Sequence, residues 1–280
     1  MLQLADNCGR SIWSRVRGEE NMLKTASLTD VGRVRTVNED RMLVQESLNG
    51  FVLAIVADGM GGHQAGDVAS QMAVDLIRDA LQTIPFGASV EERKSCIQAA
   101  IESANETIFQ FASERENYHG MGTTVVTVLA DEQSVVIGHI GDSRAYKVNA
   151  DGMEQLTEDH SLVNELVKTG QITREEAGHH PRRNVLTRAL GTEATIEVDT
   201  ADWVWTCGEV LLLCSDGLSG LVSNDQMLAL VNGAGTLEDR TRLLVEAAMS
   251  AGGDDNITVV LVSNITEPDR AEDHFDGEKR

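Results

Sequence analysis

Short apolar runs rich in β-branched residues constrain the fold of this chain more than any other feature. Four of them are FVLAIVA (Phe51–Ala57), TTVVTVLA (Thr123–Ala130), SVVIGHI (Ser134–Ile140) and VLLLC (Val210–Cys214). Runs of this length and composition, bounded by turn residues, are typical of buried β-strands. A strand at 144–148 that enters a hairpin turn, and a final strand at 256–263, are predicted on the same grounds.

Two amphipathic helices are predicted between these runs. From Ala65 to Ile84, and again from Ile97 to Ile108, apolar residues recur at the i, i+3, i+4 spacing. Such a stripe needs an apolar surface to cover. Because the strands come in hairpin-like groups rather than in strict alternation with helices, we predict an α+β fold. Antiparallel sheets should carry helices on their outer faces.

A single domain with a short extension at each end is predicted. Residues 1–24 show no clean periodicity and are interpreted as a poorly ordered leader, whereas residues 25–265 have a continuously globular pattern. Residues 266–280 are charged and nearly free of apolar side chains, which predicts a solvated tail. No internal repeat or low-complexity linker divides the chain, and 280 residues suffice for one large core.

The charge balance limits the partners that the protein can have. With 45 acidic and 23 basic residues the formal net charge is −22, and such a field repels nucleic acids and anionic membranes. No apolar stretch is long enough to span a bilayer, and no secretory signal pattern is present. The four cysteines are scattered, which favours a reduced compartment. We expect a cytoplasmic monomer that binds neither nucleic acid nor membrane.

Acidic residues stand where three of the predicted strands end. Asp58-Gly59, Asp142 and Asp216 each follow an apolar run, and Asp255 precedes the last strand. One Asp-Gly after a strand is usually only a turn. Several carboxylates at strand ends, however, can converge at a sheet edge, where they repel unless a hard cation such as Mg²⁺ or Mn²⁺ lies between them. A divalent-metal site around Asp58, Asp216 and Asp255 is therefore predicted.

A segment upstream, TDVGRVRTVNED at Thr29–Asp40, places arginines beside further acids. The planar guanidinium of arginine is suited to hold a phosphate through two charge-assisted bonds. An arginine beside a metal pair suggests phosphate chemistry. The spacing alone fits a surface ion-pair network equally well.

Eight segments, in order along the chain, resemble the metal-dependent protein phosphatases of the 2C type in their bacterial form. They are TDVGRVRTVNED (Thr29–Asp40), ADGMGGHQAGDVAS (Ala57–Ser70), GMGTTVV (Gly120–Val126), HIGDSRAY (His139–Tyr146), LTEDHSLV (Leu156–Val163), HHPRRNVLTRALG (His179–Gly191), LLCSDGLSG (Leu212–Gly220) and GGDDNITVV (Gly252–Val260). Eight ordered motifs make a chance similarity negligible, so the chain is identified as a member of that family.

The resemblance implies a four-layer αββα sandwich, with two antiparallel sheets face to face and an active-site cleft at one edge. It implies hydrolysis of phosphoserine and phosphothreonine in proteins with Mn²⁺ or Mg²⁺, two ions per chain, which activate a water for direct attack on phosphorus. The implied partners are phosphorylated proteins, namely a Ser/Thr kinase and its substrates.

The roles of the metal ligands also follow from the resemblance. It implies that Asp58 bridges the two metals and that the Gly59 carbonyl ligates one of them. Asp216 and Asp255 would complete the shell of the other metal. Glu39 would support the pair, directly or through water.

Three further regions receive roles in the same way. Arg35 aligns with the phosphate-holding arginine, so Arg35 and Asp58 are the expected catalytic residues. Asp142 aligns with a ligand of a third, weaker metal. Residues 160–191 correspond to a flap beside the cleft that is tied to substrate choice.

The chain departs from the family pattern at two positions of chemical interest. Met60 stands where many eukaryotic members carry a histidine proposed to protonate the leaving alkoxide. Methionine cannot donate a proton, so the acid is a metal-bound water or another group, with His63 a weaker candidate. Gly220 stands where relatives commonly carry an Asp of the third metal's shell, so Asp142 is expected to hold that metal poorly or not at all.

Two other functions fit the same residues. A weakly active pseudophosphatase that binds phosphoproteins as a regulator would explain the loss at Gly220. A phosphohydrolase that acts on substrates other than proteins would share the fold. Retention of Asp58, Asp216, Asp255 and Arg35 favours an active protein phosphatase.

Overall fold

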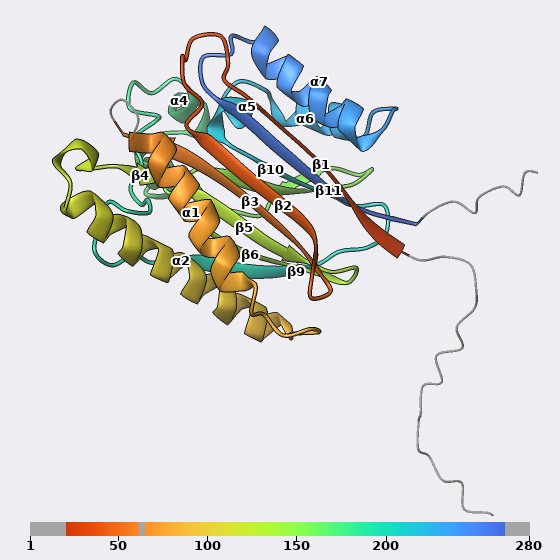
Figure 1. Cartoon of the computed structure of the whole chain (residues 1–280). Helices are drawn as coiled ribbons and strands as arrows, with labels where there is room; N and C mark the ends of the chain where they lie inside the picture. Colours follow the sequence, from red (N-terminus) through yellow and green to blue (C-terminus); the bar gives the residue numbers. More distant parts are fainter. Residues whose placement is uncertain (1–20, 62–64, 267–280) are drawn as a thin grey trace, which may run out of the picture.

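The strands form two sheets that lie face to face, and helices cover the outer face of each sheet (Figure 1). The structure is a computed structural model that describes residues 21–61 and 65–266. Every strand pair in it is antiparallel. The predicted α+β architecture, a four-layer αββα sandwich, is confirmed.

The first sheet has the strand order β1-β11-β10-β7-β8. Its strands are β1 (Asn21–Asp30), β7 (Arg144–Val148), β8 (Met153–Gln155), β10 (Val210–Cys214) and β11 (Ile257–Thr266). Its outer face is covered by α5 (Asp216–Ser219), α6 (Asn224–Val231) and α7 (Leu237–Ser250).

The second sheet has the strand order β2-β3-β5-β6-β9, and the short β4 pairs with the end of β3. The strands are β2 (Asp40–Leu48), β3 (Phe51–Met60), β4 (Gly122–Thr123), β5 (Val125–Ala130), β6 (Ser134–Ile140) and β9 (Asp199–Val204). Two long helices, α1 (Ala65–Leu81) and α2 (Val90–Ser113), pack on it, and a 3-10 turn, η1 (Glu116–Tyr118), follows α2.

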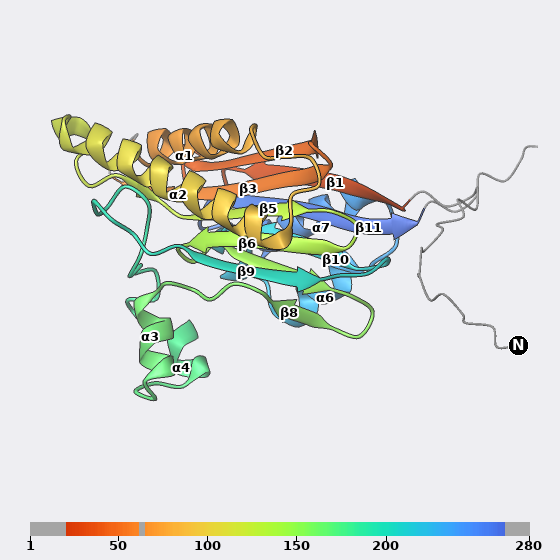
Figure 2. The same ribbon diagram turned by 90° about the horizontal axis from the view of Figure 1, so that it is seen from below.

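A small flap projects from one end of the sandwich, as Figure 2 shows. It carries α3 (Leu162–Lys168) and α4 (Arg174–Gly178). An isolated β-bridge between Ser161 and Leu186 holds the two ends of the flap side by side.

Strand β3 explains why an unbroken apolar run is needed at the centre of such a fold. Leu53 and Ile55 face α1 and α2, whereas Val52 and Ala54 face the opposing sheet. Side chains alternate between the two faces of a strand, so a central strand with covers on both sides is apolar throughout. The continuous runs of the sequence thus correspond to strands between two cores.

The expected domain boundaries differ slightly from the observed elements. Strand β1 begins at Asn21, ahead of the domain start expected at residue 25, because it pairs with β11 along its whole length. Strand β11 extends to Thr266. The remainder of the expected leader (1–20) and tail (267–280) lies outside the described residues. Within the described residues, no helix has the length and apolarity that a membrane span requires.

Candidate metal centre

The predicted acids gather at one end of the sandwich, where β3, β6 and β10 end and β2 and β11 begin. Asp40, the first residue of β2, pairs across the sheet with Asp58 near the end of β3. The carboxylate of Asp58 lies close enough to Asp40, Asp216, Asp142 and Asp255 for each of these to act on it electrostatically. Burial first, and then these four neighbours, hold the pKa of Asp58 well above its usual range.

The backbone of Asp58 is fixed by two threonines, one at the end of β4 and one between β4 and β5. The Thr123 hydroxyl and the Thr124 backbone N–H both donate to the Asp58 carbonyl, at 2.9 and 2.8 Å. The Asp58 backbone N–H donates in turn to the Thr124 hydroxyl at 3.0 Å. The Thr124 and Ser143 hydroxyls share a further bond of 2.7 Å. The carboxylate therefore stands on a rigid backbone, and the only sequence signal for this support is that Thr123 and Thr124 lie within the segment GMGTTVV.

Asp40 is a buried carboxylate that is only partly satisfied. The hydroxyls of Ser215 and Thr258 each donate to its Oδ2 at 2.7 Å. Its Oδ1 has no hydrogen-bond partner, although the residue is only 1% exposed. Burial raises the pKa of Asp40 to about 7. Ser215 is itself fully buried in this network.

Asn256 ties the arginine-bearing loop to the start of β11. Its Oδ1 accepts the Glu39 backbone N–H at 2.8 Å, and its Nδ2 donates to the carbonyls of Val31 and Val37 at 2.9 and 3.0 Å. These three bonds hold both ends of the loop, so Arg35 is presented at the site by a fixed frame. No spacing in the sequence pointed to this role of Asn256.

Glu39 and Arg35 complete the rim. Glu39 Oε1 is buried without a hydrogen-bond partner, and burial is the largest cause that raises the pKa of Glu39. The Arg35 guanidinium Nη2 donates to Asp255 Oδ2 at 2.8 Å, and the Arg35 side chain is 49% exposed. Arg35 is thus paired with one of the acids and still open to solvent.

Two glycines allow backbone segments to approach closely beside these acids. A Cβ on Gly59 would lie 2.1 Å from the carbonyl oxygen of Gly66, at the start of α1. A Cβ on Gly217 would lie 1.9 Å from the carbonyl oxygen of Asn256. Neither position tolerates a side chain without a backbone shift. The glycine after Asp58 and the glycine after Asp216 are therefore structural requirements of the site.

The remaining acids are also held in an unfavourable electrostatic environment. Burial, and then the neighbouring Asp216 and Asp159, raise the pKa of Asp142 to about 7, while Arg144 acts in the opposite direction. Burial and then Asp255 raise the pKa of Asp216, whose carboxyl shares a hydrogen bond with Asp58. Buried carboxylates that repel one another and lack enough donors are suited to a hard divalent cation. The unpartnered oxygens of Glu39 and Asp40 fit such an ion as well.

Gly220 lies at the end of α5, with φ −79° and ψ −18°. It lines the same groove as Asp142 and Asp216. Gly220 contributes no carboxylate to this part of the groove. Its φ is negative, so the backbone conformation here does not require a glycine. Met60 ends β3 opposite Gly122, while His63 lies outside the described residues.

Within the described residues, one group of side chains is compact enough to be considered as a metal site. It consists of His139, His160 and Asp199, whose candidate ligand atoms lie within 4.8 Å of one another. No three of the strand-end carboxylates lie that close together in the described residues. His160 Nδ1 accepts the Gly141 backbone N–H at 3.1 Å, so its proton sits on Nε2, which donates to Asp199 at 3.1 Å. His139 Nε2 donates to the Glu158 carbonyl at 2.8 Å. Since these nitrogens carry protons, the stacked imidazoles serve as a hydrogen-bonded brace rather than a ligand set.

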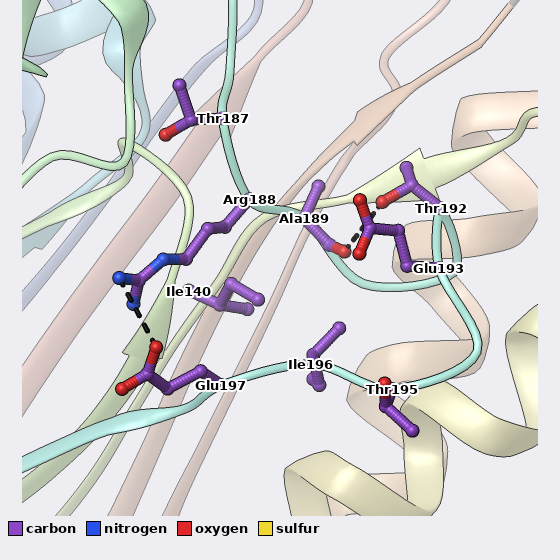
Figure 3. A pocket seen from close by; sticks show the side chains of 9 residues that line it. All are labelled: Ile140, Thr187, Arg188, Ala189, Thr192, Glu193, Thr195, Ile196 and Glu197. Atoms are coloured by element: carbon purple, nitrogen blue, oxygen red, sulfur yellow. Dashed lines mark hydrogen bonds and ion pairs between the residues drawn. The ribbon is translucent and has the colours of Figure 1, made fainter.

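A cavity of about 410 Å³ is lined mainly by the chain segment that leaves the flap, whose side chains Figure 3 shows. Its one cationic lining residue, Arg188, points toward Glu197 at 3.5 Å and also pairs with Asp199 at 3.1 Å. The cavity contains none of the predicted metal ligands. It is therefore separate from the carboxylate cluster and presents no unpaired cation to a phosphate.

Comparison with known proteins identifies the class to which this fold and site belong. Residues 32–251 match the family described as Protein phosphatase 2C. The chain belongs to this family and is a protein phosphatase, as the resemblance of its motifs predicted.

Bacterial serine/threonine phosphatases are among the proteins similar to this chain. The chain is 46% identical over 234 residues to "Serine/threonine phosphatase stp" of Listeria innocua, covering 84% of this chain and 93% of the relative. Among solved structures, "Serine/threonine phosphatase Stp1 from Staphylococcus aureus" superposes with a TM-score of 0.82 at 38% identity, covering 86% and 95% of the two chains. The catalytic domain of PstP "in complex with 2 Manganese ions" superposes with a TM-score of 0.76 at 32% identity, covering 88% and 100%.

Proposed function

We propose that this protein removes phosphate from phosphoserine and phosphothreonine side chains of other proteins, with two Mn²⁺ or Mg²⁺ ions at the carboxylate cluster. The observation that carries this proposal is the convergence of Asp58 with Asp40, Asp142, Asp216 and Asp255 at one end of the sandwich. A relative that is 46% identical is named a serine/threonine phosphatase, and one related structure holds two manganese ions.

Five groups would hold the metal pair. Asp58 lies at the centre of the cluster and would contribute to both ions, and the Gly59 carbonyl would contribute to one of them. Asp216 and Asp255 would hold the other, and Glu39 would support the pair with its unpartnered Oε1. When bound, two such cations lower the pKa of a shared water and neutralise charge on phosphoryl oxygens.

Arg35 binds the phosphate group of the substrate. Its guanidinium reaches the cluster through its 2.8 Å bond to Asp255, and about half of the side chain is open to solvent. A phosphate that enters the cleft competes with Asp255 for this fork, because arginine makes two charge-assisted bonds to such an anion. Arg35 thereby orients the phosphorus toward the cluster.

Protonation of the leaving alkoxide does not come from residue 60, because a methionine has no proton to donate. The proton comes from water or from another group. The physiological partners would be a Ser/Thr kinase and the proteins that it phosphorylates. The phosphatase would act on them as a monomer in the cytoplasm. A binding-only pseudophosphatase finds no support among the named relatives.

The test is hydrolysis of a small aryl phosphate and of a phosphothreonine peptide with Mn²⁺, before and after chelation. Both substrates should be turned over, and chelation should abolish both reactions. Asp58→Asn should lower kcat at least tenfold, equivalent to about 1.4 kcal/mol in the barrier. Its folded state should survive, because Asp58 lies outside the apolar cores.

Two outcomes would contradict the proposal. Turnover that persists at full rate in excess chelator would exclude a metal mechanism. An Asp58→Asn variant that keeps more than about a tenth of the wild-type kcat would show that the metal assignment is wrong. Circular dichroism of the variant provides the control for folding.

A further inference from the structure

A groove of about 890 Å³ runs from the carboxylate cluster to the flap. Asp142, Asp216 and Gly220 line the end at the cluster, and Arg174 and Arg183 line the part formed by the flap. Figure 2 shows the flap helices α3 and α4 projecting from the body at this end. A polypeptide whose phosphorylated residue reaches the cluster therefore has a path along the flap for its neighbouring residues.

The charged groups of the groove fall into paired and unpaired sets. Arg144 forms a two-pronged ion pair with Asp159, at 2.8 and 2.6 Å. Glu158 is paired with Lys168 at 2.8 Å. These groups neutralise one another in place and are not available to a ligand.

Arg174 and Arg183 have no ion-pair partner and no side-chain hydrogen bond within residues 21–61 and 65–266. Both side chains belong to exposed residues. An exposed guanidinium without a partner offers its planar fork to an incoming carboxylate. The flap end of the groove therefore has two unpaired positive charges.

The flap differs in charge from the rest of the molecule. Between residues 160 and 191 there are five basic residues, Lys168, Arg174, Arg182, Arg183 and Arg188, against three acidic ones, Glu165, Glu175 and Glu176. The whole chain has 23 basic and 45 acidic residues. A cationic segment in so acidic a protein is not explained by solubility, which the negative charge already provides.

The local backbone holds the two arginines in place. Arg174 follows Thr173, whose hydroxyl accepts the Glu176 N–H at 3.2 Å, while the Glu176 carboxylate accepts the Thr173 N–H at 2.8 Å. The Arg183 backbone N–H donates to the His180 carbonyl at 3.1 Å. The two guanidinium groups are thus presented from ordered turns and not from a free loop.

We propose that this groove binds an acidic stretch of the phosphoprotein substrate, and that Arg174 and Arg183 select substrates with Glu or Asp near the phosphorylated residue. The inference rests on the proposed function, since it names the substrate class for the same site. The net negative charge of the protein does not prevent an acidic peptide from binding in this groove. Charges more than about 8–10 Å away are screened at physiological salt, so contacts in the groove depend on the nearest charges.

The experiment compares three phosphothreonine peptides that differ only in their flanking residues, which are Glu, Gln or Lys. Wild type should have a kcat/KM about fivefold higher for the Glu peptide than for the Gln peptide, as two exposed ion pairs provide. Arg174→Gln combined with Arg183→Gln should bring this ratio close to one. Arg174→Glu combined with Arg183→Glu should reverse the preference in favour of the Lys peptide, which a merely structural role of the arginines would not produce.

The matched control is Arg182→Gln. Arg182 is exposed, carries the same charge and adjoins Arg183, but it does not line the groove. It should retain the wild-type ratio. A wild-type ratio of one or less, or an equal loss of preference in Arg182→Gln, would overturn the inference.

Failure of the proposed function can be distinguished from failure of this inference. If wild type with Mn²⁺ hydrolyses neither the Gln peptide nor an aryl phosphate, the proposed function is wrong. Fluorescence anisotropy of the labelled Glu and Gln peptides then still measures recognition without turnover. Tighter binding of the Glu peptide that the double glutamine variant loses supports the inference, and equal binding of both peptides overturns it.

Discussion

Two anionic groups compete for the Arg35 guanidinium, namely the Asp255 carboxylate and the phosphate of the substrate. Its pair with Asp255 engages a carboxylate that the proposed metal site also uses. Arg35→Ala should therefore raise KM for phosphorylated substrates by about tenfold, the contribution of charged hydrogen bonds. It should not weaken Mn²⁺ binding, because Asp255 is released rather than lost. Steady-state kinetics and a calorimetric Mn²⁺ titration measure the two effects.

Arg33→Ala is the matched control, since Arg33 is an exposed arginine of the same loop. It should leave KM unchanged. If instead KM for a small aryl phosphate is unaffected by Arg35→Ala and rises in Arg33→Ala, the phosphate is held by Arg33.

Single residues also mark the limit of what sequence could predict about the site. Asp58 and Asp216 were found because an acid after a buried strand has a fixed position. The tie made by Asn256 could not be found in this way, because its three bonds join segments more than 200 residues apart in the chain. The unpartnered Oδ1 of Asp40 could not be predicted from the sequence either, because burial of one carboxylate oxygen depends on how the folded chain packs around it.

At the scale of elements, the short helix α5 decides whether a third cation is held. Asp142 and Asp216 face the groove there, and Gly220 ends the helix with an ordinary helical φ. Gly220→Asp should therefore add one charged ligand and create a third Mn²⁺ site, while wild type should hold two ions tightly. A Cβ at this position would lie 2.8 Å from the Asp216 carbonyl oxygen, so a small backbone adjustment accompanies the gain.

Calorimetric titration of wild type, Gly220→Asp and Gly220→Asn measures the number of sites. The Asn variant has nearly the same shape without the charge, so it should behave as wild type. Three tight sites in wild type would contradict the expectation and would mean that another acid, with Asp225 as the first candidate, supplies the missing ligand.

Elements were predictable where one periodicity dominated. The strands β3, β5, β6 and β10 and the helices α1 and α2 follow from apolar runs and stripes. Strand β9 (DTADWV) was not recognised, because its residues are half-buried or exposed and two of the six are aspartates. It is held by six pairings with β6, so neighbouring backbone decides its conformation rather than its own sequence.

For the molecule as a whole, the crowded carboxylates make metal-free stability depend on pH. The pKa of Asp40 and of Asp142 is raised to about 7 in the folded state, whereas an unfolded Asp titrates near 4. The folded state therefore keeps the protons on these two carboxyl groups up to a higher pH than the unfolded state does. Their stabilising contribution is therefore complete below about pH 4 and is lost as pH rises through about 7. The Tm of chelated protein should fall by several degrees between about pH 5.5 and about pH 8.

Mn²⁺ should reverse this loss, because cations replace protons between the carboxylates, so the metal should raise Tm more at the higher pH. Thermal unfolding of wild type and Asp58→Asn at both pH values is the measurement. The variant should show a flatter dependence, since one charge of the cluster is gone. The buried His139 ring, whose pKa is lowered, acts in the opposite sense in both proteins. A chelated wild type whose Tm is constant or rises over this range would contradict the expectation.

The bridge between Ser161 and Leu186 has a consequence for how such enzymes can diversify. It keeps the entry and exit of the flap adjacent, and the flap helices contact each other and project from the sandwich (Figure 2). A segment anchored in this way can be exchanged for one of another length or charge with little cost to the remaining structure. Selectivity and chemistry can thus evolve as separate modules, and a flap transplanted from a relative should transfer substrate preference while the catalytic machinery stays intact.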